Sequence, residues 1–190
     1  MVATNSGAST ALHNQLSGQA LAPSRWSGGL VRHPMVRLLA LSFLALGAPA
    51  TAASNKVRIT NLSDLNFGAL ANLAADAVQS ESLCLFADTN TNGYNITATG
   101  TGPGGAFQLS SGASAMAYEV QWSSSAGQNS GSALAPNVPL SGQVSTATQQ
   151  ACSNGPASSA SLIVVLRAAT LSSASAGTYS GVLTLLVGPE

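Results

Sequence analysis

The sequence predicts an all-β protein, an antiparallel sandwich of seven or eight short strands. From Lys56 onward, apolar and polar residues alternate in short runs, which is the pattern of strands that bury one face. Clusters of Gly, Pro, Ser and Asn separate these runs, as turns do, and no long amphipathic helix competes with them. Short strands with turn signals between them are typical of two packed antiparallel sheets.

The first half of this region supplies five predicted strands. They are centred on Val57 and Ile59, on residues 83–87, on Tyr94 to Ala98, on Phe107 and Leu109, and on residues 116–123. The last is the clearest, because Met116, Tyr118, Val120 and Trp122 alternate with Ala, Glu, Gln and Ser. Its aromatic face is expected in the core, although Tyr118 and Trp122 on an exposed face would be able to bind sugar. Residues 69–78 have helical spacing and are expected to form a short helix or a loop.

The second half is less regular. Residues 123–160 are rich in Ser, Gly, Ala and Gln and predict a long connection. Residues 138–144 are expected to form a short edge strand, because Pro136 and Pro139 cannot donate ladder hydrogen bonds. Residues 162–168 predict a buried strand, and Tyr179, Leu183, Leu185 and Val187 share one face of a final apolar strand. With no successor, that strand is expected to leave an unpaired edge and an uncovered groove.

Residues 35–52 are expected to be a secretory signal. Arg37 gives a basic start, residues 38–48 form an eleven-residue apolar run, and Ala50 and Ala52 fit a small-x-small cleavage site. The run falls short of the roughly 18 apolar residues of a membrane span, so no direct membrane insertion is expected. Residues 1–34 are expected to be disordered, either an extended signal region or the product of an upstream start codon. Residues 53–190 are then a single exported domain.

The charge of residues 53–190 excludes several functions. Three bases, Lys56, Arg58 and Arg167, stand against six acids, a net charge of −3. Both histidines of the chain, His13 and His33, precede this region, which removes the usual general base and the commonest metal ligand. Three cations are too few for a phosphate backbone, so no nucleic-acid partner is expected. We expect no enzyme, no catalytic residues and no cofactor.

Cys84 and Cys152 both lie in the exported region. In an oxidising compartment this pair favours a disulfide, which would stabilise the fold by roughly 4 kcal/mol through the chain entropy of a long loop. A redox pair is the alternative, but the two cysteines are not in a C-x-x-C arrangement and no base lies nearby in the sequence.

Residues 88–93 match the first half of a calcium-binding loop. Asp88, Asn90 and Asn92 stand at ligand positions and Gly93 follows, but the twelfth position, which should be a bidentate Glu, is Thr99. The flanks are also strand-like. A hairpin turn at Asn92 and Gly93 explains the same residues, so we expect a turn and keep calcium as the weaker alternative.

Several segments together resemble the secreted pilin-like subunits of bacterial chaperone-usher systems, including the spore coat protein U type domain. They are Leu65-Asn-Phe67-Gly68, Cys84, Tyr94-Asn-Ile96-Thr-Ala98, Phe107-Gln-Leu109, Ala117-Tyr118-Glu-Val120, Cys152 and the final segment from Gly177 to Leu185. The resemblance implies an immunoglobulin-like sandwich that lacks its last strand. It further implies that a periplasmic chaperone, and then a neighbouring pilus subunit delivered at an outer-membrane usher, supplies that strand.

The resemblance therefore implies a structural subunit of an extracellular fimbria or surface coat, exported through the periplasm to the cell surface. The donor strand would lie along Tyr179, Leu183, Leu185 and Val187. Val57, Ile59 and Leu62 would be either the chain's own donor segment or its first strand, because few residues precede them in the exported region. The family also commonly has a cysteine near its first strand, which is absent here. The alternative is a self-contained secreted adhesin or carbohydrate-binding module.

Overall fold

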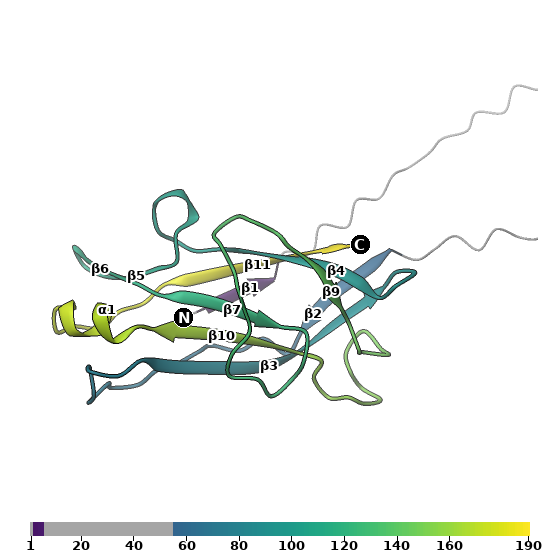
Figure 1. Ribbon diagram of the computed structural model, residues 1–190, viewed down its shortest axis with the longest axis horizontal. Coiled ribbons are helices and arrows are strands. Elements are labelled where there is room, and N and C mark those ends of the chain that lie inside the picture. The colour runs from purple at the N-terminus through teal and green to yellow at the C-terminus, as the bar shows by residue number, and fades with distance from the viewer. Residues whose placement is uncertain (1, 6–54) are drawn as a thin grey trace, which may run out of the picture. The chain divides into compact units, whose positions relative to one another are not determined.

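Alternating burial along the strands produces two sheets that pack face to face (Figure 1). The computed structural model describes residues 2–5, as backbone only, and residues 55–190. One sheet has the order β1 (Val2–Asn5), β11 (Val182–Pro189), β4 (Gly93–Thr99) and β9 (Leu140–Val144). The other has the order β2 (Lys56–Thr60), β3 (Ala77–Asp88), β10 (Ala160–Leu166), β7 (Glu119–Ser123) and β8 (Ser132–Ala133). The predicted all-β, immunoglobulin-like antiparallel sandwich is confirmed.

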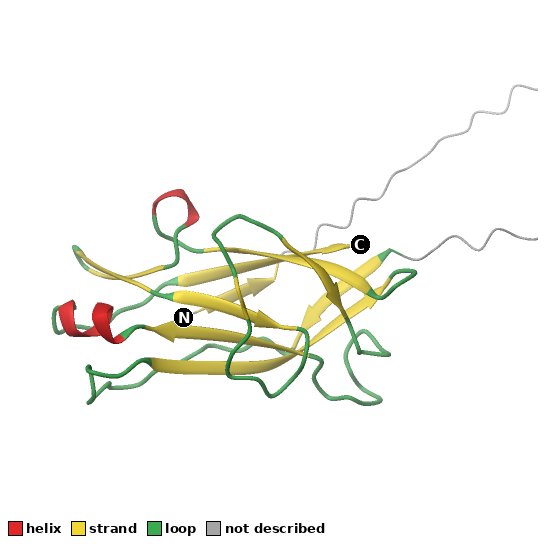
Figure 2. Cartoon of the chain, in the orientation of Figure 1, coloured by secondary structure: helices red, strands yellow, loops and turns green. Residues whose placement is uncertain are grey.

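Three smaller elements complete the described residues. Strands β5 (Gln108–Ser111) and β6 (Ser114–Ala117) form a separate hairpin, η1 (Pro103–Gly105) is a single 3₁₀ turn, and α1 (Ala168–Ser173) follows β10 directly (Figure 2). Neither helix is long and apolar enough to cross a membrane, and the described part of the chain contains no other helix.

The core lies between the inner faces of the two sheets. Side chains from β3, β4, β7, β10 and β11 meet there, and their largest fully buried members include Trp122, Tyr94, Leu85, Ile96 and Leu185. Met116, Tyr118, Val120 and Trp122 are all buried, so the predicted aromatic face is a core face. The alternation in the sequence therefore placed the inward side chains correctly.

Residues 116–123 form two strands rather than the single strand expected. β6 pairs with β5, whereas β7 pairs with β10, and the change of partner falls at Tyr118. The Tyr118 N–H donates a hydrogen bond to the Phe107 carbonyl oxygen at 3.0 Å. Side chains keep alternating through this junction, so periodicity cannot reveal where one pairing ends and the next begins.

The helix α1 was not expected. Residues 162–168 predicted one strand, but β10 ends at Leu166 and α1 begins at Ala168. The Ala168 N–H donates to Asp76 Oδ1 at 2.8 Å, so the side chain that satisfies this helix start comes from 92 residues earlier. Six residues are too few to show a helical period, and the local sequence has no capping side chain. Residues 69–76, expected as a helix or a loop, are a loop, and β3 begins at Ala77.

The last strand of the chain was expected to leave an unpaired edge, but it has neighbours on both sides, because Val2–Asn5 pairs with its first half. On one side β11 pairs antiparallel with β4 over Thr184–Pro189, and on the other it pairs parallel with β1 over Val182–Leu185. No strand was expected at Val2–Asn5. The predicted signal at residues 35–52 and the rest of the predicted N-terminal region, residues 6–34, lie outside the described residues.

Candidate functional site: an apolar groove beside the last strand

An apolar groove of about 920 Å³ opens between the segment that precedes β3 and the segment that leads into β11, and we call it the seam groove. Its floor is formed by core side chains of four elements, Leu109, Met116, Val164, Leu166 and Leu171. Its two walls are residues 64–70 with Leu73, which precede β3, and residues 174–180, which lead into β11. Leu73, on the first wall, keeps 42% of its surface exposed. The groove is therefore an open apolar channel whose floor is continuous with the core.

The first wall belongs to an irregular segment, residues 61–76, that is tied down at both ends. Near its start, Glu81 Oε1 accepts hydrogen bonds from the Ser63 N–H at 2.5 Å and the Ser63 hydroxyl at 2.6 Å. At its end, Asp76 accepts from Ala168 and from Arg167 Nη1, each at 2.8 Å. Between these ties, Leu62, Leu65, Phe67 and Leu70 pack their half-buried side chains against the core. Apolar contact therefore holds the middle of the wall.

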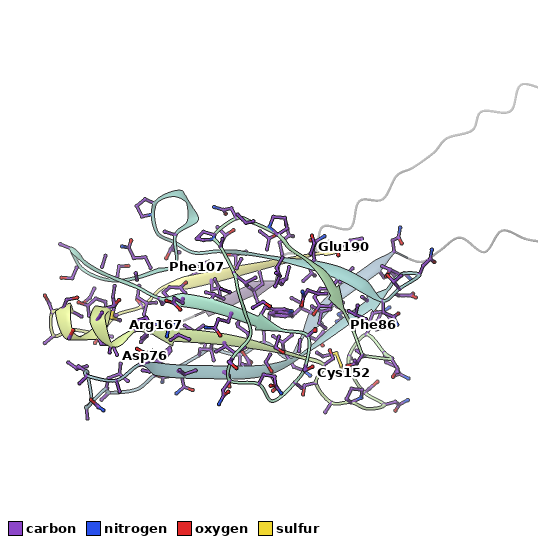
Figure 3. The ribbon with its side chains drawn as sticks, in the orientation of Figure 1. Asp76, Phe86, Phe107, Cys152, Arg167 and Glu190 are labelled. Carbon is purple, nitrogen blue, oxygen red and sulfur yellow. A yellow bond between two sulfur atoms is a disulfide. The ribbon has the colours of Figure 1, made fainter. Side chains whose placement is uncertain are left out.

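Arg167 links three strands at one end of the sandwich. Its guanidinium donates to Asp76, just before β3, and to Glu119, the first residue of β7, while Arg167 itself follows β10 (Figure 3). The hydrogen bond from the Ala168 N–H, followed by that from Arg167, holds the pKa of Asp76 below its usual value. The hydrogen bond from Arg167 likewise lowers the pKa of Glu119, and both carboxylates raise the pKa of Arg167. This ionic cluster anchors the end of the groove wall.

The four residues expected to form a donor-strand groove lie in different environments. Tyr179 lines the seam groove, and its hydroxyl donates to the Ser175 carbonyl oxygen at 3.0 Å. Leu183 and Leu185 are fully buried in the core, and Val187 is half-buried against it. The open apolar surface therefore precedes β11 rather than running under its whole length.

Most of the groove wall was not identified from the sequence. Leu70 and Leu73 belong to the stretch with helical spacing, and Leu65 and Phe67 were identified only as part of a segment that resembles pilin-like subunits. In the structure all four line one channel. The available signal was an apolar stretch, residues 62–73, too irregular for either secondary structure but too hydrophobic for a solvated loop.

Val57 and Ile59 lie in β2, and Leu62 follows it. β2 pairs antiparallel with the second half of β3, with Ile59 opposite Leu85. Ile59 is buried, and Val57 and Leu62 are partly buried against the same core. In the structure Val57 and Ile59 therefore lie in β2 of this domain, and Leu62 lies just after that strand.

The calcium-like residues form a turn between β3 and β4, but the expected hairpin is wrong, because these two strands lie in different sheets and do not pair with each other. The Asn92 N–H donates to the Thr89 carbonyl oxygen at 3.2 Å, and Asn92 has a positive φ of 53°. The Thr89 hydroxyl donates to the Gly93 carbonyl oxygen at 3.3 Å. These contacts are those of a turn built on Asn and Gly. Among the described residues, Asp88 belongs to no group of three or more His, Cys, Asp or Glu side chains that could hold a metal ion.

Cys84 and Cys152 form the predicted disulfide, with 5.9 Å between their Cα atoms. The bond joins β3 to the loop that precedes β10, beside Phe86 and away from the Arg167 cluster (Figure 3). Nearby, the Leu85 carbonyl oxygen accepts from the hydroxyls of Ser145 at 2.6 Å and Ser159 at 2.7 Å. These contacts hold the loops on either side of the disulfide against the middle of β3.

Comparison with known proteins gives a distant structural likeness. No family model and no curated protein matches this chain. Among the solved structures that match is a chain from a structure described as "Chaperone-tip adhesin complex is vital for synergistic activation of CFA/I fimbriae biogenesis". The two chains are 16% identical with a TM-score of 0.46, and the match covers 72% of this chain and 41% of that one. This chain thus spans well under half of that chain, and so distant a likeness carries no argument about function.

Proposed function

We propose that this chain is a structural subunit of an extracellular fimbria or surface coat, assembled by donor-strand complementation along a chaperone-usher route. Its partners would be a periplasmic chaperone, an outer-membrane usher and neighbouring subunits. The resemblance of its sequence segments to pilin-like subunits suggested this role. The observation that carries it is the seam groove, an apolar channel that leads directly to the edge of β11.

The groove suits an extended strand better than a rounded ligand. It lies between two irregular walls, at residues 64–73 and 174–180, and continues toward the β11 edge. The first part of that edge, Val182–Leu185, pairs with β1, and Leu186–Pro189 pair with no described strand on that side. A strand laid along it would place alternate side chains on Leu109, Met116 and Leu171 while its backbone pairs with β11. Each side chain buried in this way contributes about 1.5–3 kcal/mol before ordering costs are subtracted.

Expression with and without partners tests the proposal. The full chain is produced in a bacterial periplasm alone, or together with a pilus chaperone and usher, and soluble yield and surface fibres are measured. We expect higher soluble yield and a stoichiometric complex with the chaperone, and fibres when the usher is present. A chain that is equally soluble alone, binds no chaperone and forms no fibres would contradict the proposal.

Leu73 and Val138 offer a matched pair for the same experiment. Both are large exposed side chains, 42% and 54% exposed, but only Leu73 lines the seam groove. Leu73→Asp would place a charge in the path of an incoming apolar strand, so we expect it to reduce the chaperone complex at least severalfold. Val138→Asp should leave the complex unchanged, because its side chain lies away from the groove. Equal effects of the two substitutions would argue against the groove as the acceptor.

A self-contained secreted adhesin is the second candidate. The pairing of β1 with Val182–Leu185 favours it, because a strand of the same chain already occupies part of the β11 edge. In that case the chain would remain monomeric and soluble without a chaperone. The expression experiment above therefore separates the two candidates.

A further inference from the structure

The edge of β11 is occupied by a strand that lies far from it in the sequence. Val2–Asn5 runs parallel to β11, with Val2 opposite Val182, Thr4 opposite Thr184 and Asn5 opposite Leu185 (Figure 1). This strand belongs to the same compact unit as residues 53–190. Fifty residues, 6–55, separate it from β2, so the pairing is a long-range one.

We propose that Val2–Asn5 is an autoinhibitory strand, which occupies the β11 edge in cis and must be withdrawn before another polypeptide pairs there. This inference rests on the proposed function, in which β11 accepts a strand in trans. It adds a regulatory contact within the chain. Cleavage at the expected signal, which would remove residues 1–52 together with β1, or displacement of β1 in the uncleaved chain, would open the edge.

β1 is short enough for a longer strand to displace it from β11. It covers four residues of a strand eight residues long, and Leu186–Pro189 pair with no described strand on that side. The parallel pairing is also slightly weaker per residue than an antiparallel one. The seam groove is lined by residues 174–180, before the first β1 pair at Val182. A longer strand that extended into the groove would bury apolar surface that β1 does not reach.

β1 competes for the edge because it belongs to the same chain as β11. An intramolecular strand binds at an effective concentration that is on the order of millimolar for short linkers and falls as the linker lengthens. A weak pairing of four residues is therefore able to keep the edge occupied against dilute partners. A partner strand that makes more contacts would still displace it, as expected of an autoinhibitory strand.

A designed disulfide tests the cis pairing in the full chain. Thr4 and Thr184 are Cα partners on neighbouring strands, so the double variant Thr4→Cys/Thr184→Cys should form an intrachain bond on mild oxidation. Thr4→Cys/Thr97→Cys is the control. Thr97 lies on β4, beyond β11, at least roughly 10 Å from Thr4, too far to be bridged. Mass spectrometry after proteolysis identifies the bond, and the two native cysteines are already paired with each other.

Peptide binding tests the competition. The probe is a fluorescent synthetic peptide of residues 1–8, MVATNSGA, measured by anisotropy. Ala3→Pro/Thr4→Pro removes backbone donors of β1 and should free the edge. We expect this variant to bind the peptide at least tenfold more tightly than the native chain, and the oxidised Thr4→Cys/Thr184→Cys variant not to bind it.

The outcomes separate the two proposals. An intrachain bond in the Thr184 variant alone, with tighter peptide binding after the proline substitutions, supports autoinhibition. The pairing of β1 with β11 of the same chain would be contradicted by any of three results. These are no disulfide in the Thr184 variant, an equal yield of disulfide in the Thr97 control, or a disulfide that forms only between two chains. Equal peptide binding by the native and proline-substituted chains overturns autoinhibition while β11 remains a strand acceptor. An intrachain bond without peptide binding by any variant overturns both autoinhibition and the strand-acceptor function.

Discussion

Trp122 donates its indole N–H to the hydroxyl oxygen of Tyr94 at 2.9 Å, across the interface of the two sheets. The rings meet edge to face, with 6.4 Å between their centroids and 80° between their planes. Trp122 lies on β7 and Tyr94 on β4, and both are almost fully buried. This polar contact joins the two sheets within a largely apolar core, which makes it a sensitive point of the fold.

Tyr94→Phe should destabilise the protein by about 1–3 kcal/mol, because it leaves the buried Trp122 N–H without an acceptor. The change is measured as the free energy of unfolding in urea, followed by circular dichroism. Tyr179→Phe is the matched control, since it removes a hydroxyl whose hydrogen bond to Ser175 is exposed. We expect the control to change stability by less than about 0.5 kcal/mol. An equal decrease in the free energy of unfolding in both variants would show that the hydrogen bond between Trp122 and Tyr94 stabilises the fold no more than an exposed one.

Tyr118→Phe should have the opposite outcome and leave stability unchanged or raise it by about 1 kcal/mol. The Tyr118 hydroxyl is buried and has no hydrogen-bond partner among the described residues, while its ring stacks on Phe107 with centroids 5.7 Å apart. Phe would keep the stacking and remove the desolvated hydroxyl. A loss above about 1 kcal/mol in urea unfolding would mean that the hydroxyl makes a stabilising contact.

Alkaline pH gives a second measurement on the same residues. Burial raises the pKa of Tyr94 and of Tyr118 to about 12 each, despite the Trp122 hydrogen bond that favours ionised Tyr94. The folded state then keeps protons that the unfolded state loses from pH 10 upward, so stability falls as pH rises from 10 toward 12. In unfolding curves recorded at pH 8 and pH 11, Tyr118→Phe should lose less stability than the native chain. Identical pH dependence would contradict a raised pKa at Tyr118.

Ser159→Ala should cost about 1–3 kcal/mol, and more than Ser145→Ala. Ser159 Oγ both donates to the Leu85 carbonyl oxygen and accepts from the Leu85 N–H at 2.9 Å, so its loss removes one hydrogen bond from each of these two backbone groups of β3. Ser145 donates to the same carbonyl oxygen and accepts from the Ala147 N–H. Because the hydroxyls share one acceptor, the double variant should lose a different amount from the sum of the single variants. Strict additivity in urea unfolding would refute this shared role.

Arg167→Met should lower the stability of the folded state at neutral pH, because it removes the ion pairs with Asp76 and Glu119. It should also make that stability depend less on pH in the acid range. Asp76 and Glu119 have lowered pKa values in the folded state, so their contribution is complete above the usual carboxyl range near pH 4. It is lost as pH falls through the lowered values. Unfolding midpoints measured at pH 7 and pH 3 should therefore differ less for Arg167→Met than for the native chain. Arg58→Met is the control, because Arg58 belongs to β2 and not to this cluster.

The alternation of apolar and polar residues predicted a strand correctly where that strand keeps the same neighbours along its length and buries one face. Ile96 and Ala98 of β4 alternate with polar residues and were assigned correctly, as was the edge position of β9. Pattern failed at Tyr118, where alternation continues while the partner strand changes, and at Ala168, where Asp76 satisfies the helix start from a distant part of the chain. The groove was only partly anticipated, because its walls are irregular segments with no period of their own.

The sequence by itself determined the all-β class, the inward-facing residues and the pairing of Cys84 with Cys152. These follow from alternation and from a count of cysteines, which are properties of the chain alone. Only the tertiary structure decided which segments border the seam groove and which strand pairs with β11 on the side opposite β4. Such features arise where segments distant in sequence meet, because strand partners are selected by packing and backbone hydrogen bonding over the whole domain and not by neighbouring residues.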